Sequence, residues 1–354
     1  MYYRAEQILN AYPREFTGNM KGRGSILCTD SEGIYLLKEY NGSVRRLEVL
    51  DGVLRYLKER GFLTEELIYT REGELRYRDV DGVSYFLRKT VQGRECDTRN
   101  QDEIVYVIRH MARLHGLLAQ YGAQGEKERA AFAMREAGSI AGEDAVFSGT
   151  CGDVQGALTG GRKQPMDAAA RHTRELKKVK NYVRGKKKKN DFETEFLKGY
   201  GHYIEQAARA LEMEEEQPLP EDAMQLIHGD FNQHNLIFTR EGLALVGFEK
   251  LRWDLCVLDL SNFMRKILEK HNWNSGLGMD MVMAYNTVRA LAPWELRQLY
   301  VRLLYPEKFW KIVNHYYNTR KTWVSGRSIE KLTRLFSQEQ KREEFLSMLF
   351  YLVK

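Results

Sequence analysis

The spacing of apolar residues along the chain changes after about residue 95. Before it, short apolar runs end in turns rich in glycine and aspartate, a pattern that predicts β-strands. Ile26–Leu27 and Ile34–Tyr40 flank one such turn and predict a hairpin, and Tyr85–Arg88 predicts a further strand. From Asp102 onward, apolar residues recur every three or four positions, which is typical of helices that cover a core. The pattern therefore predicts an α+β protein, with strands first and helices afterwards.

The length of the chain predicts two lobes. At 354 residues it is longer than single hydrophobic cores usually become. The change of pattern places the first lobe at residues 1–95 and the second at 96–354. Within the second, residues 122–170 are rich in glycine and alanine and poor in large apolar residues. That composition predicts a flexible insertion, because little apolar surface is available for burial.

A polar loop separates two apolar runs in the second half of the chain. Leu226–Ile227 precedes it, Leu236–Phe238 follows it, and the loop carries His228, Asp230 and Asn235. This order predicts strand, loop and strand. Phosphoryl transfer to a hydroxyl requires a carboxylate that accepts the hydroxyl proton and a neutral oxygen ligand that holds Mg²⁺ against the phosphates. Asp230 and Asn235 are suited to these two tasks, and His228 would shape the turn behind them.

The loop resembles that of a known superfamily. Its sequence, His-Gly-Asp and then Asn after four further residues, is similar to the catalytic loop of aminoglycoside phosphotransferases and choline kinases. Within that superfamily the chain is most similar to CotS-type spore-coat proteins, at residues 175–184, 305–312 and 314–317. The resemblance implies a protein-kinase-like bilobal fold, with a small antiparallel-sheet lobe first and a mainly helical lobe second. It also implies ATP and Mg²⁺ as cofactors, a small-molecule acceptor, and a location in the cytoplasm of the mother cell or in the spore coat.

Four residues near the N-terminus are candidates for holding the nucleotide. Lys38 ends an apolar strand and resembles the superfamily lysine that contacts the phosphates; an exposed strand lysine is the alternative. Glu48 lies early in a helix predicted over about 44–60, and the resemblance implies that it pairs with Lys38, although it could equally be an exposed helix glutamate. Gly22 and Gly24 would let backbone amides approach phosphate, but a tight turn without a ligand fits these glycines as well.

The hairpin after the loop departs from the superfamily pattern. Active members carry an aspartate there that binds the catalytic metal, and Gly247 occupies the matching position. Glu249 is the nearest candidate metal ligand, but on an extended strand it would lie about 7 Å further along, so it reaches the metal only if the chain bends. Two functions are therefore open. One is ATP-dependent phosphoryl transfer to a small-molecule hydroxyl, and the other is a catalytically impaired pseudokinase that serves as a structural or binding component of the spore coat.

Composition and charge narrow the range of partners. The net charge of +6 is compatible with an acidic ligand such as a nucleotide. Lys186–Lys189 would suit nucleic acid, but a solvated turn between helices is favoured because no base-reading motif accompanies the run. No apolar stretch is long enough to span a membrane. We therefore expect nucleotide, acceptor and other spore-coat proteins as partners, and neither a membrane nor nucleic acid. The four cysteines lack metal-binding spacing and predict free thiols.

Overall fold

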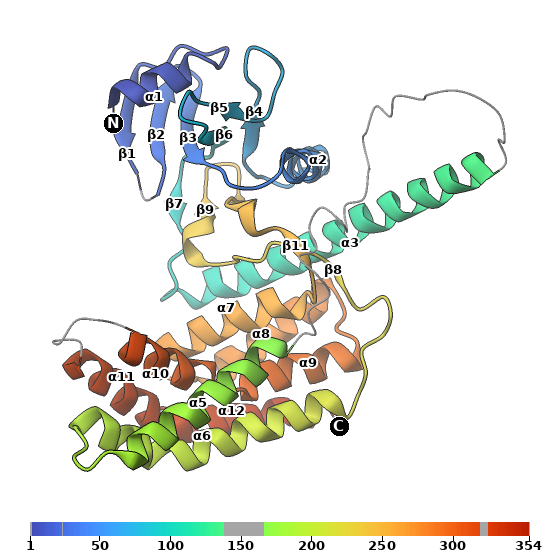
Figure 1. Ribbon diagram of the computed structural model, residues 1–354. Coiled ribbons are helices and arrows are strands. Elements are labelled where there is room, and N and C mark those ends of the chain that lie inside the picture. Colours follow the sequence, from blue (N-terminus) through green and yellow to red (C-terminus); the bar gives the residue numbers. More distant parts are fainter. Residues whose placement is uncertain (1, 23, 138–165, 319–324, 354) are drawn as a thin grey trace. The chain divides into compact units, whose positions relative to one another are not determined.

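The computed structural model describes residues 2–22, 24–137, 166–318 and 325–353 (Figure 1). The chain divides into two compact units. The first comprises Met1–Gly160 and Gln225–Trp253, and the second comprises Gly161–Met224 and Asp254–Lys354. The polar loop with His228 thus belongs to the same unit as the N-terminal strands. The boundary between lobes that the sequence predicts near residue 95 stays a prediction.

An antiparallel sheet forms much of the first unit. Its strands are β1 (Gly18–Lys21), β2 (Ile26–Asp30), β3 (Gly33–Glu39), β4 (Glu66–Ile68), β5 (Tyr77–Arg78) and β6 (Ser84–Thr90). They follow the order β1-β2-β3-β6-β4, and β5 pairs with β6. Lys38 is opposite Phe86, and Leu36 is opposite Arg88. Because alternate residues of a strand share a face, the side chains of Lys38 and Arg88 lie on the same face of the sheet.

The other face of β3 is buried. Tyr35 and Leu37 pack with Ile8 and Leu9 of α1 (Tyr2–Leu9). This alternation explains why Lys38 is turned away from the hydrophobic core. The predicted helix after β3 is α2 (Val44–Glu59), and Ser43 is its N-cap, because the Ser43 side chain accepts a hydrogen bond from the N–H of Arg46.

Short strands and turns frame the polar loop. The elements are β7 (Arg94–Glu95), β8 (Gln225–Ile227), η1 (Gln233–Asn235), β9 (Leu236–Phe238), β10 (Leu243–Leu245), η2 (Phe248–Lys250) and β11 (Arg252–Asp254). β9 and β10 form the predicted hairpin, to which β7 adds a third strand, and β8 pairs with β11. The two 3₁₀ turns, η1 and η2, each follow a change of chain direction and carry candidate site residues.

Helices cover both ends of the segment 122–170, for which the sequence predicts a flexible insertion. α3 (Gln101–Ala137) continues through the first sixteen residues of that segment, and α5 (Asp167–Gly185) begins before its end. Residues 122–137 are rich in alanine, glutamate and arginine, which favour helix even where large apolar residues are scarce. Residues 138–165 lie outside the described residues.

The second unit is helical in its described part. Its helices are α5, α6 (Asp191–Glu215), α7 (Val257–Lys270), α8 (Ser275–Val288), α9 (Pro293–Leu304), α10 (Glu307–Asn318), α11 (Ser325–Ser337) and α12 (Glu339–Tyr351). One core cluster joins α5, α6, α10 and α11 through residues such as Leu176, Phe196, Phe309 and Leu332. The predicted order of strands first and helices afterwards is confirmed. Among the helices described, none combines the length and apolarity needed to cross a membrane.

Candidate functional site

His228 fixes the shape of the polar loop. Its imidazole is fully buried. Nδ1 accepts a hydrogen bond from the N–H of Asp230 at 3.1 Å, and Nε2 lies 3.1 Å from the carbonyl oxygen of Val246. Since Nδ1 is the acceptor, Nε2 carries the proton and donates to Val246. The imidazole therefore joins the start of the loop to the segment that leads into Gly247.

Gly229 allows a close approach of two backbone segments. Its φ is +78°, and a Cβ at this position would lie 2.3 Å from the carbonyl oxygen of Lys250. No other residue type fits without moving the backbone. The loop and the 248–250 turn are thus in direct contact behind Asp230.

Asp230 and Asn235 are joined by a hydrogen bond. The Asn235 Nδ2 donates to the carbonyl oxygen of Asp230 at 2.9 Å. The Asp230 carboxylate lies 2.9 Å from the Nζ of Lys250. Burial alone would raise the pKa of Asp230, but the ion pair with Lys250 outweighs it, and the pKa lies below its ordinary value. Asp230 is therefore ionised at neutral pH and able to accept a proton.

The chain bends at Gly247. β10 ends at Leu245, and Gly247 adopts the left-handed conformation with φ 83° and ψ 41°. A Cβ on residue 247 would lie 2.7 Å from the Oδ1 of Asn235 and 2.8 Å from its Nδ2. Gly247 therefore lies beside Asn235, and its match to the metal-ligand position stays a prediction. The amide of Asn235 fills the space that a side chain at residue 247 would need.

The bend brings Glu249 back toward the N-terminal sheet. Its Oε1 lies 3.0 Å from the Nζ of Lys38 and 3.0 Å from Nη1 of Arg88. Burial alone would raise the pKa of Glu249, but the charges of Arg88 and Lys38 hold it below its ordinary value. The extended path that would carry Glu249 away from residue 247 is therefore not followed.

The ion pair predicted between Lys38 and Glu48 is not formed. Lys38 pairs with Glu249 instead, and Glu48 is exposed on α2. Leu47 and Leu50 occupy the buried face of α2. Residue 48 lies about 100° around the helix from residue 47, which turns its carboxylate toward solvent.

Gly22 and Gly24 lie in the connection between β1 and β2. The N–H of Gly22 donates to the carbonyl oxygen of Ser25 at 2.8 Å, and Gly24 has a φ of +72°. A Cβ at Gly24 would meet no atom within 4 Å, so its backbone is open on that side. The geometry is that of a tight turn, and a phosphate-covering role for it stays a prediction.

The buried ion pair of Arg88 and Glu65 is not among the site residues predicted from the sequence. Nη1 of Arg88 lies 2.7 Å from Glu65 Oε2, and the two side chains are 9% and 1% exposed. Glu65 Oε1 accepts hydrogen bonds from the N–H groups of Gly247 and Phe248, both at 3.1 Å. The carboxylate of Glu65 thus holds the bend, and Arg88 links it to Glu249. The signal in the sequence was an arginine that directly follows the apolar run Tyr85–Leu87.

Arg46 is a second residue that sequence analysis did not place in the site. Its Nη2 donates to the carbonyl oxygens of Glu249 and Leu251, at 3.1 and 2.9 Å. A single guanidinium therefore clamps the end of the 248–250 turn to α2. Together, Arg46, Arg88 and Lys38 surround the turn with positive charge.

Replacing Arg88 by methionine should lower the free energy of unfolding by about 3 kcal/mol, because it leaves the buried Glu65 without its ion-pair partner. Lys58→Met is the matched control. Lys58 pairs with Glu66 at the same distance of 2.7 Å, but its side chain is 65% exposed, so the loss should be below about 1 kcal/mol. Chemical denaturation of both variants measures the difference. Equal losses would show that the Arg88 pair is no more than a surface contact.

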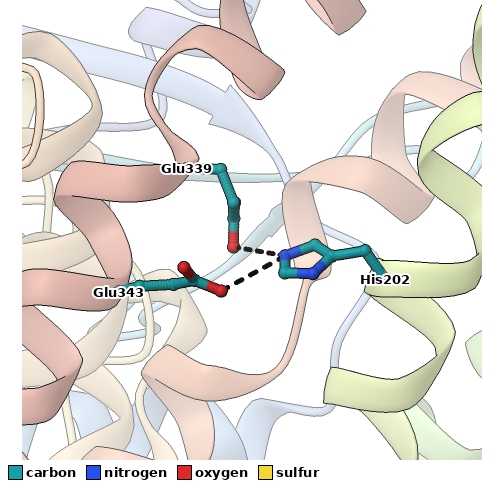
Figure 2. A group of neighbouring side chains, drawn as sticks. All are labelled: His202, Glu339 and Glu343. Atoms are coloured by element: carbon teal, nitrogen blue, oxygen red, sulfur yellow. Dashed lines mark hydrogen bonds and ion pairs between the residues drawn. The ribbon is translucent and has the colours of Figure 1, made fainter.

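A second polar cluster lies in the second unit (Figure 2). His202 Nε2 is 3.0 Å from Glu339 Oε1 and 3.6 Å from Glu343 Oε1, a spacing that can hold a metal ion. Arg342 and Gln206, however, already donate to the same Glu339 oxygen, each at 2.7 Å. The charge of Glu339 is therefore compensated by protein groups. We interpret the cluster as a polar network that joins α6 to α12.

Comparison with known proteins identifies relatives by sequence family and by fold. Residues 170–349 match the family model described as "Spore coat putative kinase YutH". No curated protein matches the sequence.

Solved phosphotransferase structures share the fold. An aminoglycoside phosphotransferase from Alicyclobacillus acidocaldarius is 17% identical with a TM-score of 0.76, over 98% of this chain and 96% of that one. A spectinomycin phosphotransferase in complex with ADP and spectinomycin is 10% identical with a TM-score of 0.59, over 96% and 98%. A choline/ethanolamine kinase family protein from Mesorhizobium loti is 13% identical with a TM-score of 0.54, over 100% and 99%. The predicted protein-kinase-like α+β fold is confirmed.

Proposed function

The chain belongs to the spore coat putative kinase YutH family, and from this premise we propose that it binds ATP and transfers the γ-phosphoryl group to a small-molecule hydroxyl. One observation carries the proposal. Lys38, which is about 200 residues away in sequence, lies together with Asp230, Asn235 and Glu249 around the 248–250 turn within one compact unit. A lysine, a base and two oxygen ligands at one place are the groups that a phosphoryl-transfer site requires, and a purely structural role does not require this combination.

Asp230 is the proposed base. Its carboxylate is ionised and held by Lys250, so it can orient an acceptor hydroxyl and take its proton as the phosphoryl group is transferred. Lys38 would contact the nucleotide phosphates. Its present partner, Glu249, keeps the ammonium group in place until a phosphate approaches. His228 acts on the loop, and the bond to the N–H of Asp230 fixes the direction of the base.

The oxygen ligands present are suited to Mg²⁺, which prefers oxygen atoms. Asn235 uses its Nδ2 for Asp230, so its Oδ1 is the end available as a ligand. Glu249 adds an ionised carboxylate. Its closest contacts to Lys38 and to Arg88 both use the same oxygen, Oε1. When bound, Mg²⁺ would neutralise charge on the phosphates. Asn235 and Glu249 are the residues that would hold it.

A second function, a catalytically impaired pseudokinase in the spore coat, is favoured by a different observation. Residue 247 has no side chain, and its left-handed backbone leaves no room for one beside Asn235. With one metal ligand fewer, charge stabilisation of the transition state falls. Such a protein would still bind nucleotide or a coat partner. The family description supports association with the spore coat in either case, and the mother-cell cytoplasm is the other proposed location.

Nucleotide binding is the direct test of the site. ATP with Mg²⁺ should raise the melting temperature of the wild-type chain, because a ligand that binds only the folded state stabilises it. Lys38→Met should weaken ATP affinity about tenfold, which corresponds to the loss of roughly one charged contact. Lys58→Met, which removes an exposed lysine, should change affinity little. A wild-type chain that ATP does not stabilise, with or without Mg²⁺, would rule out the site.

A further inference from the structure

The charges of the second unit are segregated along its sequence. Residues 171–189 contain ten lysine and arginine residues and one acidic residue, a formal charge of +9 that exceeds the +6 of the whole chain. Residues 212–222 contain six acidic residues and no basic one, a formal charge of −6. Two short stretches thus carry strong charges of opposite sign.

The basic stretch forms an exposed surface. α5 buries His172, Leu176 and Val183, and its cations lie on the opposite side. Lys186 pairs with Glu193, and Arg171 with Glu175. The other exposed cations of α5 and of the turn that follows it are here called the basic patch: Arg174, Lys177, Lys178, Arg184, Lys187, Lys188 and Lys189.

The acidic stretch is also exposed, at the other end of α6. Glu214 accepts a hydrogen bond from Gln298, and Glu216 pairs with Arg297. The remaining carboxylates are here called the acidic patch: Glu212, Glu215, Glu221 and Asp222, all of them exposed.

α6 holds the two patches apart. The lysines of the turn precede Asp191, where α6 begins, and the acidic patch lies at the other end of the helix, with Glu212 and Glu215 in its last turn and Glu221 and Asp222 beyond it. The 25 residues of α6 span about 37 Å. Phe192, Phe196 and Tyr203 anchor α6 in the core cluster, so the helix is a rigid spacer. Charges interact over about 8 Å at physiological ionic strength. The lysines of the turn and the acidic patch of one molecule therefore cannot neutralise each other.

We propose that the basic patch of one copy binds the acidic patch of a second copy of this chain. The contact joins two different surfaces, so each added copy leaves one basic and one acidic patch free at the ends of the assembly. Contacts of this head-to-tail kind close into rings or extend into filaments. Because both patches consist of exposed charges, the association is weak, reversible and sensitive to salt. It is independent of nucleotide binding and of transfer.

Sedimentation of the full chain over a range of concentrations tests the proposal. In about 20 mM salt the weight-average mass should rise with concentration to at least roughly twice that of the monomer, and in about 500 mM salt it should fall to the monomer value. The triple variant Lys187→Glu, Lys188→Glu, Lys189→Glu should stay monomeric in low salt. The triple variant Glu215→Lys, Glu221→Lys, Asp222→Lys should behave in the same way.

Mixing the two triple variants gives the sharper result. The first keeps the native acidic patch and the second keeps the native basic patch, so an equimolar mixture should associate although neither does alone. Glu6→Lys, Glu72→Lys, Glu241→Lys is the matched control for the second triple variant, because it raises the net charge by the same amount at exposed positions of the first unit and should associate as the wild type does.

Three outcomes would overturn the proposal. The first is a wild-type chain that stays monomeric in low salt at high concentration. The second is a mixture of the two triple variants that does not associate although both variants are folded by circular dichroism. The third is a monomeric wild type that binds a short RNA, with binding lost in the lysine variant, which would make nucleic acid the occupant of the basic patch.

Discussion

Replacing Asp230 by asparagine is expected to lower phosphoryl transfer by at least about 100-fold. The amide keeps the size of the side chain but cannot accept a proton from the acceptor hydroxyl. Nucleotide affinity should change little, because Lys38, Asn235 and Glu249 are untouched and the bond from Asn235 goes to the main-chain oxygen of residue 230. A loss in kcat with unaltered affinity is the pattern of an interaction made only in the transition state.

The measurement is transfer from labelled ATP to a panel of hydroxyl compounds, namely aminoglycosides, choline, ethanolamine and aminopropanol. Asp280→Asn, at an exposed position of α8, controls for the change of charge and should be fully active. Undiminished transfer by Asp230→Asn would remove Asp230 from the mechanism. A wild-type chain that binds ATP but transfers to no acceptor would favour the pseudokinase.

The parts of the site that are local in sequence could be predicted from it. His228, Asp230 and Asn235 belong to one loop between two apolar runs, and the structure joins them through bonds within that loop and the segment it contacts. Lys38 was selected because it ends an apolar strand, and strand alternation does turn it away from Tyr35 and Leu37. In each case, residues within a few positions of the site residue determine where its side chain lies.

The partner of Lys38 could not be predicted, because it depends on contacts distant in sequence. Glu249 reaches Lys38 only because the chain bends at Gly247, and Glu65 holds that bend through two backbone N–H groups. Glu65 is in turn fixed by Arg88, whose place on the face of Lys38 follows from the register of β3 with β6. Periodicity gives the faces of a strand but not the register between strands.

Gly247→Asp would restore the carboxylate of active relatives, yet we expect it to destabilise the chain by about 2 kcal/mol and not to tighten Mg²⁺-nucleotide binding. A side chain at φ 83° is strained. Its Cβ would also lie within 2.8 Å of three side-chain atoms of Asn235, which must move and lose its bond to Asp230. The substitution therefore adds one oxygen ligand and displaces another.

Gly73→Asp is the matched control for backbone strain. Gly73 has a φ of +81°, and a Cβ there would meet no atom within 4 Å. Backbone strain is therefore the only cause of lost stability in Gly73→Asp. Chemical denaturation should show a smaller loss of stability than for Gly247→Asp, by about 1 kcal/mol, the value of the hydrogen bond that Asn235 gives up. ATP titration with Mg²⁺ completes the comparison. The opposite result would be that Gly247→Asp lowers the free energy of unfolding no more than Gly73→Asp does and binds Mg²⁺-nucleotide more tightly than the wild type. In that case the Asn235 side chain moves aside without a loss of stability, and a carboxylate fits beside it. The missing aspartate would in that case be a loss of function that one substitution repairs, and the pseudokinase would become the better description of the wild-type chain.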